Sequence, residues 1–210
     1  DNNEQLKILL NLKIDNLSQK EKIYFCYSKA NLYHNNKDYK KSAYFLKIAN
    51  EEKLKIQPSD LKTKLNTGEY YRELKINKTL NVQNKKDTNR YLFIVGMPRC
   101  GSTLLESILS LNTGVEDLGE VPFLEESLKK TNNLLDVKNL YSEKVVLINS
   151  KKKIFTDKNL FNFLYCPIIY SFFPNARIIH CMRNPLDNLL SIYRTNFLNQ
   201  SFSSSLNDIT

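Results

Sequence analysis

The first quarter of the chain carries a helical pattern of hydrophobic and polar residues. Between residues 21 and 54, apolar side chains recur three and four positions apart, which is the spacing of one face of an α-helix. The polar run 35–38, Asn-Asn-Lys-Asp, interrupts them with residues that favour turns and helix caps. We therefore predict two helices joined by a short turn, with flanking helices over 4–14 and 60–76.

Beyond residue 90 the pattern changes to short, continuous apolar runs. Residues 91–95 form one run and 176–182 another, and 155–158 end a third. Runs of this length, bounded by glycine, proline and polar residues, are typical of buried strands in a parallel sheet. The pattern predicts an α/β fold in which helices flank a parallel sheet, preceded by an all-α helical-repeat segment.

A helix is expected after the run 91–95 and another after the run 176–182, because apolar residues follow each of them at helical spacing. The apolar faces are expected at Leu104, Leu105, Ile108 and Leu109 in one helix, and at Leu186, Leu189, Leu190 and Tyr193 in the other.

Length and composition agree with two small domains. The 210 residues, 41% hydrophobic and 25% charged, divide into a helical segment (1–76), an Asn- and Lys-rich linker (77–90) and an α/β domain (91–210). No run approaches the roughly 20 apolar residues of a membrane span, so no membrane partner is expected. The chain begins without Met and stops soon after the last predicted helix. We expect a fragment whose α/β domain is truncated at its C-terminal side.

The distribution of charge and of cysteines argues against several classes of partner and site. The net charge is +9, but residues 1–90 hold 19 Lys and Arg against 11 Asp and Glu, and the rest is nearly balanced. The lysines are scattered along helical segments, so no nucleic-acid partner is expected. The four cysteines are far apart and form no Cys-x-x-Cys pair, which argues against a zinc site and a secreted disulfide framework. We expect a cytoplasmic location.

A candidate anion-binding loop, residues 96–103, joins the first strand to its helix. A helix N-terminus offers unpaired N–H groups and a partial positive charge, which bind phosphate or sulfate. Gly101 allows close backbone approach, and Arg99 supplies a planar charged fork. Ser102 and Thr103 add hydroxyl donors. The spacing is that of a nucleotide triphosphatase loop, but Ser102 stands where that loop needs Lys.

The segment 93–104, Phe-Ile-Val-Gly-Met-Pro-Arg-Cys-Gly-Ser-Thr-Leu, resembles the 5′-phosphosulfate loop of sulfotransferases. The resemblance implies that it binds the sulfate donor PAPS (3′-phosphoadenosine-5′-phosphosulfate). Cys100 replaces the usual Ser; backbone N–H groups make the main contacts there, so we expect little loss, and a reactive thiol is the alternative. The chain is most similar to bacterial sulfotransferases with tetratricopeptide repeats, which are akin to protein-tyrosine sulfotransferases.

The helical pair itself resembles one tetratricopeptide repeat. The matching small and aromatic positions are Ala30, Tyr33, Asp38, Tyr39, Ser42, Leu46 and Ala49. Cys26 replaces the usual Trp. Such repeats bury their apolar faces in arrays of about three. The pair is therefore expected either to cap the catalytic domain or to belong to an array that binds a peptide or protein partner.

A second phosphate site is expected where Arg183 ends one strand and Ser191 follows eight residues later, about two helical turns away. In sulfotransferases, Arg and Ser at this spacing bind the 3′-phosphate of PAPS. Without the loop at 96–103, a surface arginine beside a helix cap would be the simpler interpretation.

Two further segments resemble the catalytic machinery of that family. Lys158 ends a Thr-Asp-Lys segment whose Lys polarises the transferring group. Glu120 lies 21 residues after Arg99, as does the catalytic carboxylate of tyrosylprotein-type enzymes. A base must take the proton of the acceptor. Glu116, Asp117 and Glu125 are competing candidates for this base, whereas His180 is expected to pack in the core.

These features and the resemblance predict a sulfotransferase that moves a sulfuryl group from PAPS to an unknown acceptor hydroxyl or amine, with a protein tyrosine as one candidate acceptor and with no metal. One alternative is a P-loop kinase or nucleotide triphosphatase that binds Mg·ATP. Another is a non-catalytic scaffold of helical repeats.

Overall fold

The computed structural model describes residues 17–74, 89–148 and 150–210. The chain forms two compact units. One contains residues 64–184, and the other contains residues 1–63 and 185–210. The helix predicted at 4–14 and nearly all of the linker predicted at 77–90 lie outside the described residues.

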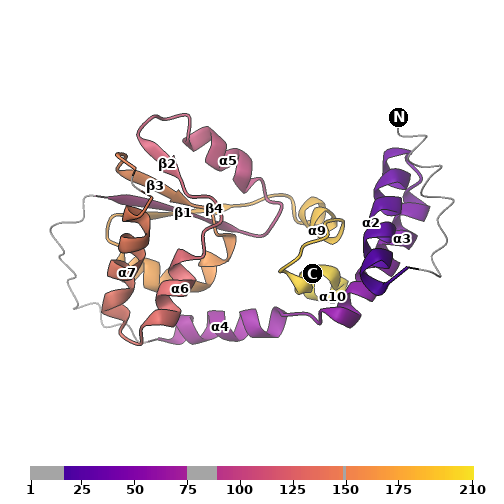
Figure 1. Cartoon of the computed structure of the whole chain (residues 1–210), viewed down its shortest axis with the longest axis horizontal. Helices are drawn as coiled ribbons and strands as arrows, with labels where there is room; N and C mark the ends of the chain where they lie inside the picture. The colour runs from indigo at the N-terminus through magenta and orange to yellow at the C-terminus, as the bar shows by residue number, and fades with distance from the viewer. Residues whose placement is uncertain (1–16, 75–88, 149) are drawn as a thin grey trace. The chain divides into compact units, whose positions relative to one another are not determined.

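The unit 64–184 is built on a four-stranded sheet (Figure 1). Every strand pair is parallel, and the order is β2-β3-β1-β4. The bounds are β1 Arg90–Gly96, β2 Val115–Asp117, β3 Ile154–Asp157 and β4 Ala176–Cys181. The predicted α/β fold with a parallel sheet is thus confirmed. The short strand β2 was not predicted, because three residues carry too little pattern.

Helices cover both faces of this sheet. Figure 1 shows α5 on one face and α6 and α7 on the other. The helical segments are α4 Leu61–Glu73, α5 Ser102–Leu109, α6 Phe123–Lys130, α7 Leu134–Val146, the 3₁₀ helix η2 Leu160–Tyr165, and α8 Cys166–Phe172. Helix α4 confirms the helix predicted at 60–76, and its first three residues belong to the other unit.

Aromatic rings fill the core on the α7 face of the sheet. Tyr91 and Phe93 of β1 are at most 1% exposed, and they meet the buried Tyr141 and Phe173. The rings of Tyr91 and Tyr141 lie edge to face, with centroids 5.3 Å apart. Such pairs bury large areas and prefer this geometry. This core holds β1, and therefore the loop that follows it, against a rigid support.

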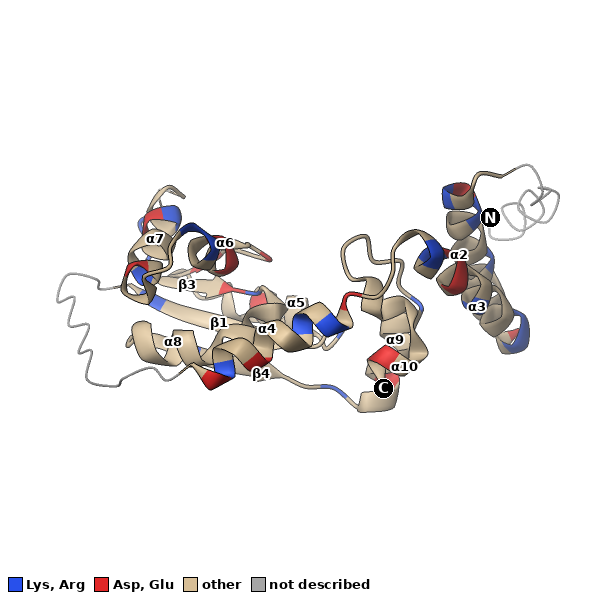
Figure 2. Ribbon diagram, turned by 90° about the horizontal axis from the view of Figure 1, so that it is seen from below, with Lys and Arg blue, Asp and Glu red and all other residues tan. Residues whose placement is uncertain are grey.

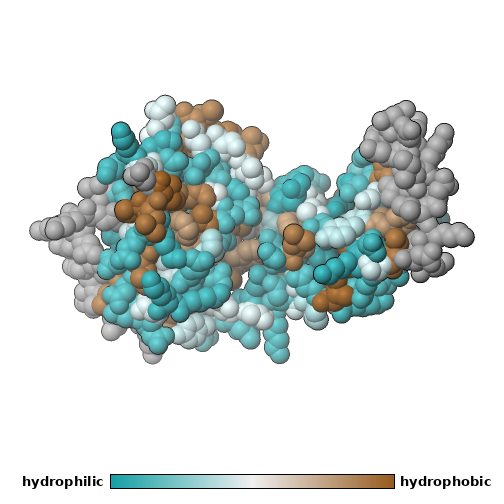
Figure 3. Space-filling model, in the orientation of Figure 1, coloured by the Kyte–Doolittle hydropathy of each residue, from teal (hydrophilic) through white to brown (hydrophobic). Residues whose placement is uncertain are grey.

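The predicted apolar faces of two helices are partly wrong. Leu104 and Ile108 of α5 are 68% and 55% exposed, and Figure 3 shows apolar surface over this helix. The buried residues of α5 are Ser102 and Glu106 instead. The phase of the helix is set by the loop before it and by polar partners on the sheet, which periodicity does not contain.

Helix α9, Pro185–Tyr193, also buries a face other than the predicted one. Leu186 and Leu190 are 77% and 55% exposed, whereas Asn188 and Ile192 are buried. Both faces of this helix carry apolar side chains, so its periodicity does not single out one of them.

The second unit contains the predicted helical pair, α2 Gln19–Asn35 and α3 Tyr39–Ile56. Ser18 and Glu21 form a capping box at the start of α2, and the Asp38 carboxylate accepts the Lys41 N–H at the start of α3. Ala30 and Ala49, at most 1% exposed, let the helices pack closely. The prediction of two helices joined by a short turn is confirmed.

The C-terminal segment belongs to the same unit as this pair. It contains α9, the 3₁₀ helix η3 Ser201–Ser204 and α10 Leu206–Ile209. Asn50 of α3 donates to the Tyr193 carbonyl at 3.1 Å, and Asp60 accepts the Phe202 N–H at 3.0 Å. Residues 185–210 and the helical pair therefore belong to one compact unit.

Helices α2 and α3 carry side chains of both charges on their surfaces. Figure 2 shows Lys and Arg interspersed with Asp and Glu along α2 and α3. Within the described ranges, no helix is long and apolar enough to cross a membrane.

Candidate functional site

The loop between β1 and α5 has an unusual backbone. Arg99 has a φ of 67° and Gly101 a φ of 101°, both in the left-handed region that favours glycine. Gly101 is the N-cap of α5, and no side chain caps this helix. The first turn of α5 therefore directs N–H groups that no capping side chain occupies, together with a partial positive charge, towards the loop.

Glycine is required at position 96 for a different reason. A Cβ there would lie 2.5 Å from the carbonyl oxygen of Cys181 and 3.3 Å from the Cys100 sulfur. Only glycine lets β4 approach the end of β1 this closely. At Gly101 a Cβ would meet nothing within 4 Å, so its backbone angle rather than its surroundings favours glycine.

The predicted loop residues divide into buried and exposed side chains. Cys100 and Ser102 are 6% and 5% exposed, so their side chains turn inward. Arg99 and Thr103 are exposed. The Cys181 thiol donates to the Cys100 carbonyl at 3.5 Å. Burial and the neighbouring Cys100 thiol raise the pKa of Cys181 to about 11, which keeps it protonated at neutral pH.

The structure brings Arg183 to this loop. Arg183, just after β4, donates from Nη1 to the carbonyl oxygen of Arg99 at 3.3 Å. The two guanidinium-bearing residues thus stand at neighbouring strand ends. Ser191, its predicted partner for a 3′-phosphate, belongs to the other compact unit, and that pairing stays a prediction.

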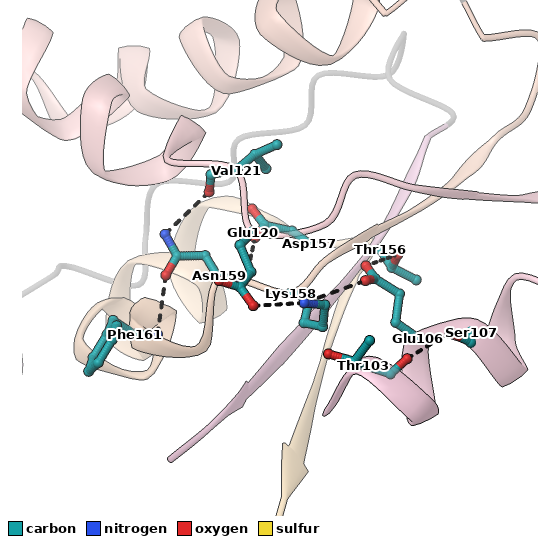
Figure 4. Close-up of polar contacts among 10 residues, drawn as sticks. All are labelled: Thr103, Glu106, Ser107, Glu120, Val121, Thr156, Asp157, Lys158, Asn159 and Phe161. Carbon is teal, nitrogen blue, oxygen red and sulfur yellow. Dashed lines mark hydrogen bonds and ion pairs between the residues drawn. The ribbon is translucent and has the colours of Figure 1, made fainter. Parts of the chain in front are cut away.

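A second cluster gathers around Lys158 (Figure 4). The Lys158 Nζ donates to Glu120 Oε1 at 2.9 Å and lies 3.9 Å from Glu106 Oε2. Thr156 Oγ1 donates to Glu106 Oε1 at 2.8 Å. The side chains of Lys158 and Glu106 are both 7% exposed, and that of Glu120 is 65% exposed.

Backbone pairing explains why Glu120 meets Lys158. Beyond β2, the Leu118 N–H donates to the Thr156 carbonyl at 3.0 Å, and the Lys158 N–H donates to the Gly119 carbonyl at 2.8 Å. These bonds extend the contact between β2 and β3 past the ends of both strands. Gly119, with a φ of 68°, then turns the chain so that Glu120 follows beside Lys158.

Asp157 supports this arrangement from the other side of the sheet. Its carboxyl accepts hydrogen bonds from the Tyr141 hydroxyl, the Asn159 N–H and the Asn162 amide, each at 3.0 Å. Burial raises the pKa of Asp157 from its ordinary 3.8 to about 7, against the lowering effect of these donors. Asp157 thereby holds the turn that follows β3 and carries Lys158.

Two of the competing candidates for a base, Glu116 and Glu125, are engaged elsewhere. Glu116 accepts a hydrogen bond from Ser150 at 2.7 Å and pairs with Lys152, and these contacts lower its pKa. Glu125 pairs with Lys129 on the surface of α6. His180 is exposed, so its expected place in the core is wrong, because β4 is an edge strand whose pattern of burial is mostly open.

Both clusters lie at one edge of the sheet. The neighbouring strands β3, β1 and β4 are parallel, so their carboxyl ends share an edge, where open α/β sheets bind ligands. Arg99, Lys158 and Arg183 all follow such ends. In the part of the chain that the structure describes, no group of three or more His, Cys, Asp and Glu side chains could hold a metal ion.

Sequence reasoning missed Glu106 and Asp157. A signal existed for Glu106, which is the one charged residue in Ser102–Leu109. A single carboxylate within an apolar helix, next to an anion-binding loop, is a candidate site residue. For Asp157, no local pattern distinguishes a buried carboxyl from an exposed one at a strand end.

Comparison with known proteins supports a sulfotransferase-like fold for part of the chain. Residues 133–210 match the model of a family described as the Sulfotransferase family. The match includes Lys158, Arg183 and Ser191 but does not reach the loop at 96–103. It supports a sulfotransferase-like fold, and sulfuryl transfer in general, for this part of the chain.

One relative extends over more of the sequence. An uncharacterized protein of Aquifex aeolicus (strain VF5) is 33% identical over an alignment of 133 residues, and the match covers 52% of this chain. The chain spans 18% of the length of that protein. No solved structure matches the chain.

Proposed function

We propose that this chain binds PAPS and transfers its sulfuryl group to an acceptor hydroxyl or amine. The observation that carries the proposal is the meeting of two chemistries at one sheet edge. A helix N-terminus without a capping side chain follows Arg99, and beside it a buried lysine contacts an exposed carboxylate. The family match over residues 133–210 supports the same reaction.

In the proposed mechanism, the loop N–H groups and Arg99 bind the 5′-phosphosulfate, with Cys100, Gly101, Ser102 and Thr103 supplying the backbone and hydroxyl donors. Preorganised donors of this kind stabilise developing charge without reorganisation. Arg183 and Ser191 bind the 3′-phosphate. The two phosphate contacts would distinguish PAPS from nucleotides that carry only a 5′-phosphate chain.

Lys158 and Glu120 perform the transfer. Glu120 removes the proton from the acceptor, whose oxygen or nitrogen then forms a bond to sulfur. The bond between sulfur and the bridging phosphate oxygen breaks, and 3′-phosphoadenosine 5′-phosphate (PAP) leaves with the electron pair. Lys158 offsets the negative charge on the transferring group. Because Glu120 stands at the position of the catalytic carboxylate in the tyrosylprotein-type enzymes that the sequence resembles, a protein tyrosine is the acceptor to test first.

Ligand selectivity tests the proposal. PAP should bind more tightly than 5′-AMP or ATP, because neither competitor carries a 3′-phosphate. Charge-assisted hydrogen bonds contribute about 1.5–3 kcal/mol, so the preference for PAP over 5′-AMP should be roughly 10- to 100-fold by calorimetry. Equal affinity for PAP and 5′-AMP would contradict the 3′-phosphate site, and preference for Mg·ATP would favour a P-loop kinase or nucleotide triphosphatase.

Two variants locate the binding energy. Arg99→Ala should weaken PAP binding to a similar degree, since it removes a charged fork. Cys100→Ser is the matched control in the same loop, and it should leave affinity nearly unchanged because the thiol is buried and turned inward. A large loss in Cys100→Ser with no loss in Arg99→Ala would reverse these roles.

A further inference from the structure

Glu106 lies in a place where a carboxylate is costly. It is 5% exposed, in a helix whose other residues carry no charge. A buried carboxylate persists when a countercharge and hydrogen-bond donors surround it. Glu106 has both, since Thr156 donates to one oxygen and the Lys158 ammonium lies 3.9 Å from the other.

The two carboxylates around Lys158 differ in their freedom to move. Glu106 comes from α5, is held by the fully buried Thr156, and shares the low exposure of Lys158. Glu120 comes from the loop after β2, and 65% of its side chain is exposed. Glu120 can therefore leave Lys158 for water, whereas Glu106 is enclosed, and its separation from Lys158 would leave a buried carboxylate without its countercharge.

We propose that Glu106 is the positioning residue of Lys158, and that Glu120 is its exchangeable partner. The inference rests on the proposed sulfuryl transfer. Before the donor binds, Lys158 is paired with both carboxylates. The sulfonate oxygens of the donor then replace Glu120 on the ammonium, while Glu106 keeps the ammonium in place. Glu120, released from its ion pair, becomes free to accept the proton of the acceptor.

This arrangement sets the order in which donor binding and proton removal occur. The base is released only when the donor is bound, because the sulfonate is what displaces Glu120. Glu106 contacts neither the donor nor the acceptor and acts only through Lys158, and Thr156 fixes the direction of its carboxylate.

The reactivity of the Lys158 amine tests this proposal directly. Acylation of individual lysines by a small amine-reactive reagent is quantified by mass spectrometry on the whole chain without any nucleotide. Glu106→Gln keeps the shape of the side chain and its bond to Thr156 but removes the charge, so Lys158 should be acylated roughly tenfold faster than in the parent. Glu120→Gln should change the rate far less, because Glu106 remains.

Lys129 on α6 is the internal control, because it pairs only on the surface and its rate should not change. Thr156→Val is the second variant, should Glu106→Gln fold poorly. It leaves both charges in place and frees one carboxylate oxygen, and the acylation rate of Lys158 should rise to an intermediate value. An unchanged Lys158 rate in the folded Glu106→Gln variant, or an equal increase in Glu120→Gln, would overturn the positioning role.

Activity provides the second readout. With PAPS and an acceptor, Glu106→Gln should lower kcat by roughly 10²-fold with little change in PAP affinity, since the transition-state charge loses a positioned cation. A loss confined to PAP affinity would contradict the proposal. If PAP does not bind the parent chain at all, the proposed function fails, while the acylation result still decides whether Glu106 holds Lys158.

Discussion

Neighbouring residues at the end of β3 serve opposite faces of the sheet. Asp157 turns towards Tyr141 of α7, and Lys158 turns towards Glu106 of α5. Alternation of side chains along an extended chain produces this division. One short segment therefore joins the aromatic core to the proposed reaction site, so a change in either residue is expected to be felt by the other.

The pH dependence of stability should report on Asp157. Its pKa rises from 3.8 unfolded to about 7 folded, so the folded protein binds more protons between these values. The contribution of the carboxyl is fully present below about pH 4 and is lost as the pH rises towards 7. Asp157→Asn does not titrate. Its stability relative to the parent should improve by about 2 kcal/mol between pH 5 and pH 8 in urea unfolding.

Tyr141→Phe provides the matched comparison for this effect. It removes one of the three donors that favour the ionised carboxylate, so the loss of stability with rising pH should extend to higher pH and become larger than in the parent. A stability difference between Asp157→Asn and the parent that stays constant with pH would show that Asp157 is ionised throughout this range.

Glu120→Gln should separate binding from chemistry. The carboxylate contacts Lys158 and does not cap α6, whose N-terminus has no side-chain cap. PAP affinity should be retained, and the transfer rate of a full-length form should fall by about 10²- to 10⁴-fold, the range for loss of a general base. Glu125→Gln on α6 is the control and should transfer at the parental rate. Undiminished turnover in Glu120→Gln would move attention to Glu116 and Asp117.

At the scale of elements, helix ends were easier to predict than helix faces. The turn between α2 and α3 was marked by its Asn-Asn-Lys-Asp sequence, and Asp38 caps α3 there. The buried faces of α5 and α9 were predicted only in part, because α5 turns Glu106 rather than its leucines towards the sheet and α9 carries apolar side chains on both faces. Caps depend on residues within one turn, whereas the choice of a face depends on what the helix packs against.

The same turn contains a residue whose replacement is expected to increase stability. Lys37 has a φ of 61°, just after the end of α2, at a position where helices commonly place glycine. Lys37→Gly should stabilise the helical pair by about 0.5–1 kcal/mol, because glycine adopts this conformation without steric cost. Lys47→Gly within α3 should instead destabilise it by about 1 kcal/mol. Thermal unfolding of both variants checks the contrast, and a lower Tm in Lys37→Gly would contradict it.

At the scale of the whole molecule, residues far apart in the sequence fold as one unit. Asn50 is 1% exposed and joins α2, α3 and the C-terminal segment by accepting from the Tyr27 hydroxyl and donating to the Leu46 and Tyr193 carbonyls. The helical pair and the C-terminal segment therefore form one compact unit.

Asn50→Ala should loosen the C-terminal segment. It leaves buried polar groups of α2 and of the segment without partners, at a cost of about 1–3 kcal/mol. Limited proteolysis followed by mass spectrometry should show faster cleavage within residues 185–210. Glu51→Ala, at the neighbouring exposed position, is the control, and this variant should be cleaved at the parental rate. Equal rates in the two variants would show that Asn50 does not hold the segment.

The amino-acid sequence by itself determined the local elements of this protein. The helical pair, the strands β1, β3 and β4, and the loop from Gly96 to Thr103 could be predicted because periodicity, caps and glycine positions act over a few residues. The proximity of Glu120 to Lys158 could be suspected only through resemblance to a family, since 38 residues separate them.

Tertiary structure decided what these elements do together. Strand order brought Arg183 to Arg99, and the pairing of β2 with β3 brought Glu120 to Lys158. It also buried Glu106 beside Lys158 and joined residues 185–210 to the helical pair. Burial and ion pairing depend on atoms that only the folded chain brings into contact, so no local pattern carries them.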